Sequence, residues 1–155
     1  MVNIFDIISQ VNARSEPVHS RYLAAVLKES AEGDGQFLRA FWNRAVALPN
    51  DSPAWASPPT ALDVCPEDQL RDARIDIVIH APAARLIVGI EIKTSDLSVE
   101  YGQLNAYLEL LREKYAGYDI RMVYLTPFNR DNPYQARDLS MRSRSLMDSL
   151  KLTDW

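Results

Sequence analysis

The sequence predicts an α/β (α+β) fold, in which helices flank a central mixed sheet of four strands. Apolar residues recur at helical spacing before residue 49, whereas short β-rich runs lie within residues 61–93 and 120–126. The last two β-rich runs are separated by a helical pattern, which favours parallel pairing between them. The two runs within 74–93 are separated by a short turn, which favours antiparallel pairing. Together they indicate one mixed sheet with helices packed on it.

Three helices are expected before the first strand. Helical spacing predicts a short helix over residues 3–12. A second helix should begin near Pro17, since proline is tolerated in a first helical turn. A third should follow the Gly-Asp-Gly segment at 33–35 and extend to Val46. Residues 49–59 contain four prolines and are expected to form a loop.

The first strands are expected in the middle of the chain. Ala61–Cys65 is read as a short strand, and Leu86–Lys93 as a central strand covered on both faces. Arg74–His80 alternates in polarity. This alternation predicts one face with Ile75, Ile77 and Ile79, and another with Arg74, Asp76, Val78 and His80.

The remaining elements complete the sheet. A helix is expected over Ser98–Tyr115, with Ser98 as its N-cap, followed by a buried strand over Ile120–Thr126. Residues 128–138 are expected to be a polar loop, and Ser140–Leu150 a last helix.

Length and composition limit the class of protein. We expect the 155 residues to form a single domain, with 49–59 as an internal loop and 128–155 as a C-terminal extension. The N-terminus does not resemble a signal peptide, and no apolar run is long enough to cross a bilayer. Cys65 is the single cysteine, so a cytoplasmic location is the default expectation. The net charge of −4 argues against a general nucleic-acid-coating protein, but a nuclease can combine clustered carboxylates with a locally basic face.

Two acidic residues and a lysine form the main candidate site. Residues two apart on a strand share a face, so Glu91 and Lys93 project together. Asp76 lies on the preceding strand, and a hairpin turn around residues 81–84 can bring it beside Glu91. Mg²⁺ prefers oxygen ligands, and it could be held by these two carboxylates and the backbone carbonyl of Ile92. Such a metal would activate water against a phosphodiester, with Lys93 assisting.

The alternative is an ordinary surface ion pair. Taken by itself, the Glu91-Ile92-Lys93 triplet favours that alternative. Its context favours a site, because Glu91 follows an almost wholly apolar run and a charge there needs a partner or a metal. Asp76 is similarly framed by isoleucines.

These residues resemble the signature of the PD-(D/E)XK nuclease superfamily, and flanking segments resemble one bacterial branch of it. The resemblance covers about residues 3–127, and its motifs are Arg74-Ile75-Asp76-Ile77-Val78-Ile79, Glu91-Ile92-Lys93, Glu16-Pro17-Val18-His19-Ser20, Gln103-Leu104 with Tyr107, and Val123-Tyr124-Leu125-Thr126-Pro127. The resemblance implies a restriction-endonuclease-like core. Ile75 replaces the motif proline, and the chain after Pro127 is shorter than is usual in this branch, so a truncated form is one interpretation and the substrate stays open.

The resemblance also implies further site residues. Glu16 becomes a candidate third carboxylate, with a favourable helix-start charge as the alternative. Gln103 becomes a candidate for holding water or phosphate, and an exposed helix glutamine is its alternative. His19, Ser20 and Tyr107 are weaker candidates for nucleic-acid contact, with structural roles as their alternatives.

The sequence leaves two functions to weigh. The first is a Mg²⁺-dependent endo- or exonuclease acting on DNA, with Mn²⁺ as a substitute metal. The second is a catalytically inactive member of the same fold that binds nucleic acid or a protein. The intact Asp76, Glu91 and Lys93 favour the enzyme. Many nucleases of this kind cut as dimers, so a homodimer is compatible with the first function.

Overall fold

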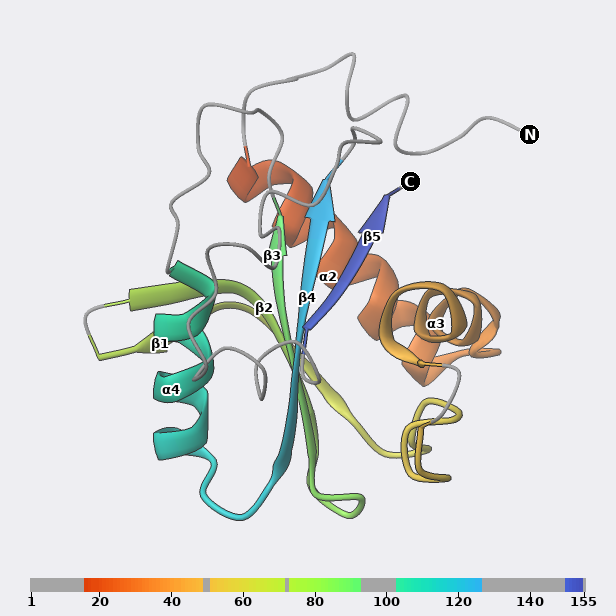
Figure 1. Ribbon diagram of the computed structural model, residues 1–155. Helices are drawn as coiled ribbons and strands as arrows, with labels where there is room; N and C mark the ends of the chain where they lie inside the picture. Colours follow the sequence, from red (N-terminus) through yellow and green to blue (C-terminus); the bar gives the residue numbers. More distant parts are fainter. Residues whose placement is uncertain (1–15, 49–50, 72, 93–102, 127–149, 155) are drawn as a thin grey trace.

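A five-stranded mixed sheet organises the chain (Figure 1). The computed structural model describes residues 16–48, 51–71, 73–92, 103–126 and 150–154. The helices are α2 (Glu16–Glu32), α3 (Gln36–Phe41), the π-helical segment η1 (Trp42–Val46) and α4 (Gln103–Lys114). The strands are β1 (Asp63–Leu70), β2 (Ala73–Ala81), β3 (Leu86–Ile92), β4 (Asp119–Thr126) and β5 (Leu150–Asp154).

The strands follow one another across the sheet in sequence order, β1-β2-β3-β4-β5. β1 pairs with β2 and β2 with β3 in antiparallel fashion, whereas β3–β4 and β4–β5 are parallel. A parallel pair needs a crossover, and α4 supplies it between β3 and β4. The expected fold class and both kinds of pairing are therefore confirmed.

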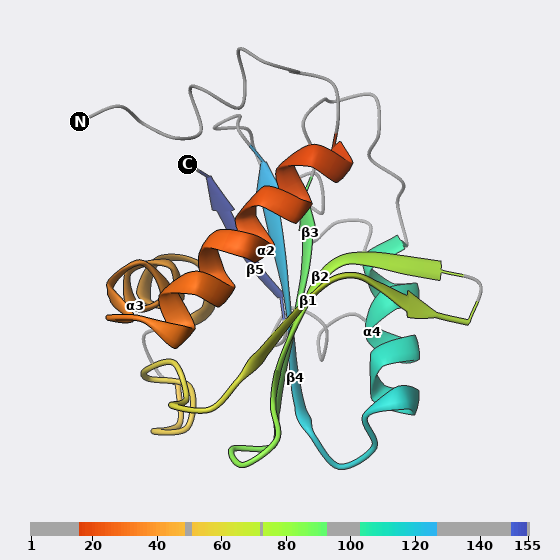
Figure 2. The ribbon, with the colours of Figure 1, turned by 180° about the vertical axis from the view of Figure 1, so that it is seen from behind.

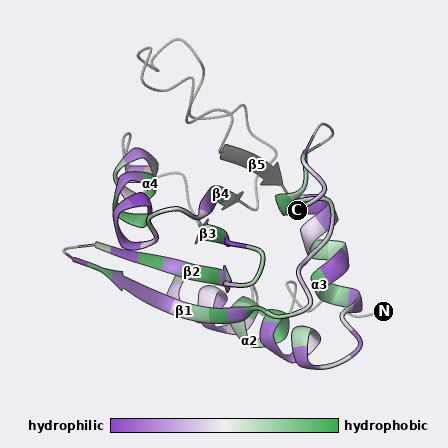
Figure 3. Cartoon of the chain, turned by 90° about the horizontal axis from the view of Figure 1, so that it is seen from below, coloured by the Kyte–Doolittle hydropathy of each residue, from purple (hydrophilic) through white to green (hydrophobic). Residues whose placement is uncertain are grey.

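Helices cover both faces of the sheet. One core cluster packs α2, α3 and η1 against β2, β3 and β4 through residues such as Leu27, Trp42 and Val88. A second cluster packs α4 on the other face, through Leu108 and Leu111 against Met122. The view from below separates α4 from α2 across the sheet (Figure 3). All seven residues of β3 are buried, which confirms it as the covered central strand.

Most expected elements are present with small shifts in their bounds. The second helix begins at Glu16, the third continues into η1, and residues 51–59 lack helix and strand as expected. The helix expected over Ser98–Tyr115 is described from Gln103 onward. The expected helix over 3–12, the N-cap Ser98, the loop over 128–138 and residues 140–149 lie outside the described residues. None of the described helices is long and apolar enough to cross a membrane.

Three expectations need correction. The first strand is longer than Ala61–Cys65, because β1 continues through Pro66 to Leu70. An edge strand tolerates proline, since its outward N–H group needs no partner strand. The sheet has a fifth strand, and Leu150 belongs to it rather than to a helix.

The third correction concerns Ile75. Ile77 and Ile79 belong to the core on the α2 face, but Ile75 packs in the cluster around α4. The ladder between β2 and β3 ends at Ile77, and β1 and β2 curve away from β3 toward α4 (Figures 1 and 2). Simple alternation therefore fails at the residue before Asp76, because the strand changes direction there.

Candidate active site

Asp76 and Glu91 lie at adjacent positions on neighbouring strands. Ile77 pairs with Ile90 at the end of the β2–β3 ladder, and Asp76 and Glu91 are each one residue further on. The hairpin expected from the sequence therefore has the register that brings the two acidic residues side by side.

A side-chain hydrogen bond replaces the next rung of this ladder. The backbone N–H of Ile92 donates to Oδ2 of Asp76 at 2.8 Å. This bond places the Asp76 carboxylate beside the main chain of β3, next to the residue that follows Glu91. It also gives a hydrogen-bond acceptor to the N–H group of Ile92, which lies beyond the last backbone pair of the β2–β3 ladder.

Glu91 is buried on the α4 face of the sheet. Its side chain is only 3% exposed. Ile90 and Ile92 pack on the α2 face, and strand alternation directs Glu91 to the opposite face. A carboxylate at this depth needs a compensating cation or hydrogen-bond donors.

The first turn of α4 holds a polar pair on the same face. Nε2 of Gln103 donates to the hydroxyl oxygen of Tyr107 at 2.7 Å. Tyr107 is 6% exposed and shares the α4 cluster with Tyr124. Tyr124 is in turn the β4 partner of Glu91 in the sheet register. The Gln103–Tyr107 pair and the β4 partner of Glu91 therefore belong to the same side of the sheet.

The α2 candidates approach from the other face. α2 packs through Leu23 and Leu27, on the side of the sheet away from α4. Its N-terminal end lies at the same end of the sheet as the arrowheads of β3 and β4 (Figures 1 and 2). Glu16 is the first residue of α2, and its side chain lies outside the described set.

His19 and Ser20 occupy the next positions of α2. His19 is half-buried. Ser20 is 0% exposed, and its hydroxyl donates to the carbonyl oxygen of Pro17 at 3.1 Å. Its burial and this hydrogen bond favour a packing role for Ser20, and its contact with nucleic acid stays a prediction.

The donor set suits a hard divalent cation. Carboxylate and carbonyl oxygens, available from Asp76, Glu91 and Ile92, are the ligands that Mg²⁺ and Mn²⁺ prefer. In the part of the chain that the structure describes, no group of three or more His, Cys, Asp or Glu residues could hold a metal ion. Lys93 lies outside the described residues, as does the side chain of Glu16, the candidate third carboxylate.

A charged cluster beside Asp76 was not foreseen from the sequence. Glu67 on β1 contacts Arg21 of α2 and Arg74 of β2. Its position follows from the β1–β2 register, which no motif in the sequence reveals. The expected alternation placed only Arg74 near Asp76, two residues along the same strand.

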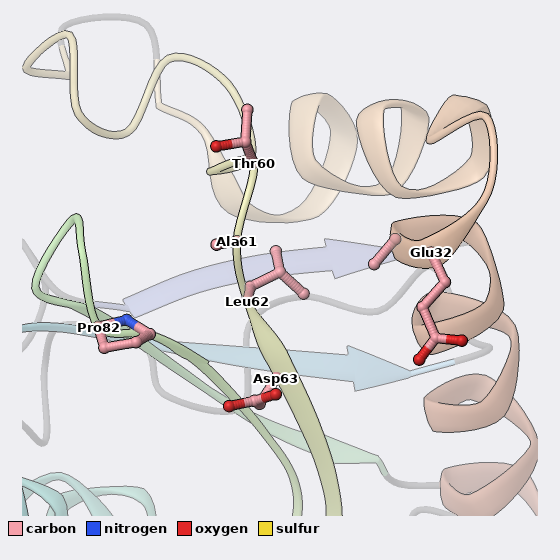
Figure 4. Close-up of a pocket in the computed structure, with 7 residues that line it drawn as sticks. Glu32, Thr60, Ala61, Leu62, Asp63 and Pro82 are labelled. Atoms are coloured by element: carbon pink, nitrogen blue, oxygen red, sulfur yellow. The ribbon is translucent and has the colours of Figure 1, made fainter.

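The larger of the described pockets lies away from these residues. It has a volume of about 290 Å³ and lies between the end of α2 and the start of β1, lined by Ala31, Glu32, Thr60, Ala61, Leu62, Asp63 and Pro82 (Figure 4). Asp63 pairs with His80, at the end of β2 opposite to Asp76. The candidate acidic pair is therefore not part of this pocket.

Comparison with known proteins gives one match. The family model described as PD-(D/E)XK nuclease superfamily matches residues 2–155. Searches of the curated proteins and of the solved structures find no match. The family match spans nearly the whole chain, including the strands that carry the acidic pair.

Proposed function

The chain belongs to the PD-(D/E)XK nuclease superfamily, and we propose that it is a metal-dependent nuclease that hydrolyses phosphodiester bonds in DNA. The observation that supports this most directly is the adjacency of Asp76 and Glu91 on β2 and β3. The family supports a nuclease-type function. The metal, the DNA substrate and the residue roles are the parts that we propose.

Asp76, Glu91 and the carbonyl oxygen of Ile92 would hold Mg²⁺, or Mn²⁺ in its place, with Glu16 as a candidate third carboxylate. A bound divalent ion lowers the pKa of a coordinated water and offsets charge on the phosphate. The Ile92 N–H orients the Asp76 carboxylate. Burial of Glu91 excludes bulk water and strengthens its attraction for a cation.

Other side chains would act on the water and the phosphate. Lys93 would orient the attacking water and offset charge on the transition state. Gln103 would hold water or a phosphate oxygen, and Tyr107 would position its amide through the 2.7 Å hydrogen bond. His19 remains a proposed phosphate contact at the start of α2. A homodimer and a cytoplasmic location stay predictions.

A cleavage assay tests the proposal. Purified protein is incubated with linear, circular and single-stranded DNA in Mg²⁺, Mn²⁺ or EDTA. We expect cleavage that requires the metal and is lost in Glu91→Gln and Lys93→Ala. Glu109→Gln is a matched control, because it removes an exposed carboxylate on α4. Far-UV circular dichroism confirms that each variant is folded.

The result that would overturn the proposal is equally specific. It is the absence of cleavage by the wild-type protein in every metal condition, with DNA binding that Glu91→Gln and Lys93→Ala leave unchanged. That outcome would favour a catalytically inactive binding protein of the same fold.

A further inference from the structure

Glu67 stands between two arginines that come from different elements. Its Oε2 atom accepts hydrogen bonds from Nη2 of Arg21 at 2.8 Å and from Nε at 3.2 Å. Its Oε1 atom lies 3.6 Å from Nη1 of Arg74. One carboxylate of β1 therefore holds a guanidinium of α2 and a guanidinium of β2.

Two members of this cluster, Glu67 and Arg74, occupy strand positions next to Asp76. In the β1–β2 ladder, Pro66 pairs with Ile77 and Asp68 with Ile75, so Glu67 occupies the position across from Asp76. Neighbouring strands are about 5 Å apart, and two residues span about 7 Å along a strand. The backbones of Glu67 and Arg74 thus flank the proposed metal ligand at these spacings.

The backbone of Glu67 is strained. Its φ angle is 54°, a left-handed value that a glutamate rarely adopts and that carries a conformational cost. The ion pairs of Glu67 with the two arginines are exposed. Of the Arg21 side chain 66% is accessible to solvent, and of the Arg74 side chain 56%. Exposed pairs contribute little to stability, so stability alone is a weak reason for this arrangement.

The cluster has the charge and the donors to bind an anion. Two guanidiniums and one carboxylate leave a net charge of +1 next to an acidic centre. The bonds to Glu67 use two of the five N–H donors of Arg21. Guanidinium groups recognise phosphate oxygens through paired N–H donors, and they keep their charge at all physiological pH values.

We propose that Arg21 and Arg74, positioned by Glu67, bind a backbone phosphate of the nucleic-acid substrate next to the cleavage centre. This inference rests on the proposed nuclease function and adds residues to the same site. Arg21 and Arg74 are the binding residues, and Glu67 is a positioning residue. The competing explanation is that Arg21 and Glu67 only tie α2 to β1.

Salt-dependent binding separates the two explanations. Binding of duplex DNA, single-stranded DNA and single-stranded RNA is measured in EDTA, so that no cleavage interferes. Each phosphate contact contributes about 0.9 to the slope of log K against log salt for duplex DNA, and about 0.7 for single strands. We expect the slope of the R21Q/R74Q variant to be smaller than that of the wild type by about one phosphate contact. The slope of R21K/R74K should stay close to that of the wild type. The nucleic acid that binds most tightly at one fixed salt concentration is the preferred substrate, because the slope itself differs between duplexes and single strands.

Two further variants sharpen the test. Arg39→Gln removes an exposed arginine of α3, whose Nη2 donates to the carbonyl oxygen of Asp34, and should leave the slope unchanged. Glu67→Gln removes a negative charge, so simple electrostatics predicts tighter binding. We expect weaker binding instead, by about tenfold, because an amide offers one acceptor oxygen and one NH2 donor and so can hold only one of the two guanidiniums.

The outcomes are distinguishable from those of the cleavage assay. Unchanged slopes in R21Q/R74Q, tighter binding by Glu67→Gln, or no wild-type binding even at low salt would each overturn the inference. If the wild type does not cleave DNA but R21Q/R74Q has a smaller salt slope than the wild type, the nuclease proposal fails and the phosphate site stands. If the wild type cleaves DNA in a metal-dependent way but R21Q/R74Q has the wild-type salt slope, the nuclease proposal stands and the phosphate site fails.

Discussion

Oδ2 of Asp76 accepts a hydrogen bond from the backbone N–H of Ile92 at 2.8 Å, across the gap where β2 turns away from β3. This bond gives Asp76 a structural task besides the one proposed at the metal. It satisfies a main-chain donor that the ladder leaves at its end, and it orients a carboxylate toward the strand that carries Glu91. The structural task and the metal-binding task can be separated, because only metal binding requires a negative charge on residue 76.

Substitution of Asp76 should therefore separate stability from activity. Asp76→Asn keeps an oxygen that can accept the Ile92 N–H, so the free energy of unfolding should change by less than about 1 kcal/mol. Metal-dependent cleavage should fall by about 100-fold or more, because a neutral amide holds a cation poorly. Asp76→Ala should lose the same activity. Its free energy of unfolding should fall by about 1–3 kcal/mol, because the N–H group of Ile92 is left without an acceptor. Urea unfolding and initial cleavage rates give both quantities. Wild-type activity in Asp76→Asn would contradict the metal role.

The hydrogen bond from Gln103 to Tyr107 predicts a non-additive pair of substitutions. If Tyr107 acts only by positioning Gln103, Tyr107→Phe should lower kcat by about tenfold with little change in KM. Gln103→Ala should lower it at least as much, and the double variant should match Gln103→Ala. Additive losses would show instead that Tyr107 acts independently. Asn105→Ala, a change of a nearby α4 residue, serves as the control.

The sequence predicted the sheet more completely than the surroundings of the site. Apolar residues at a regular period located β2 and three helices, and continuous apolar runs located the buried strands β3 and β4. They placed Asp76 beside Glu91, since a short turn fixes the register of a hairpin. They failed at Ile75, where the strand bends, because alternation assumes a straight strand.

The residues around Asp76 escaped prediction for a related reason. Arg21, Glu67 and Arg74 meet only because β1 extends through Pro66 and Glu67 takes a left-handed backbone conformation. A single sequence carries no pattern for a contact between a helix and an edge strand 46 residues apart.

Gly89 should be needed for the close approach of α4 to β3. A Cβ atom at this position would lie 2.5 Å from Sδ of Met122 and 2.9 Å from Cδ1 of Leu111. Met122 and Leu111 are both fully buried, so Gly89→Ala should destabilise the protein by about 1–3 kcal/mol. Cleavage should fall as well, because α4 carries Gln103. The G89A/M122A variant should recover part of the stability, and no recovery would contradict the steric explanation.

A buried ion pair should anchor the proline-rich loop. Arg121 donates to both carboxylate oxygens of Asp51 at 2.6 and 2.7 Å, and to the carbonyl oxygen of Val46 at 2.6 Å. The Arg121 and Asp51 side chains are only 6% and 10% exposed. The Arg121 guanidinium also lies 4.2 Å from the centre of the Trp55 ring.

Removal of either Arg121 or Asp51 should lower the free energy of unfolding by about 3–5 kcal/mol, because it leaves the other charge buried without a partner. We expect this loss in Asp51→Ala, measured by urea unfolding, and a smaller loss in the D51A/R121M variant. The exposed pair of Arg71 with Glu113 gives a control, since Arg71→Ala should cost less than about 1 kcal/mol. Equal losses in the buried and the exposed pair would contradict the anchoring role.

The Arg21–Glu67 contact also predicts a pH dependence. The hydrogen bond from Arg21, with the nearby positive charges, lowers the pKa of Glu67 below its ordinary value of 4.5, against a smaller opposing effect of desolvation. A carboxyl whose pKa is lower in the folded state stabilises the protein above its unfolded pKa, and that contribution is lost as the pH falls through the folded value. The difference in unfolding free energy between wild type and Glu67→Gln should therefore be constant near pH 7 and shrink below about pH 4.5. High salt should also reduce it, because the groups are exposed to screening ions. A difference that grows on acidification would show that charge on Glu67 is not what holds the two arginines.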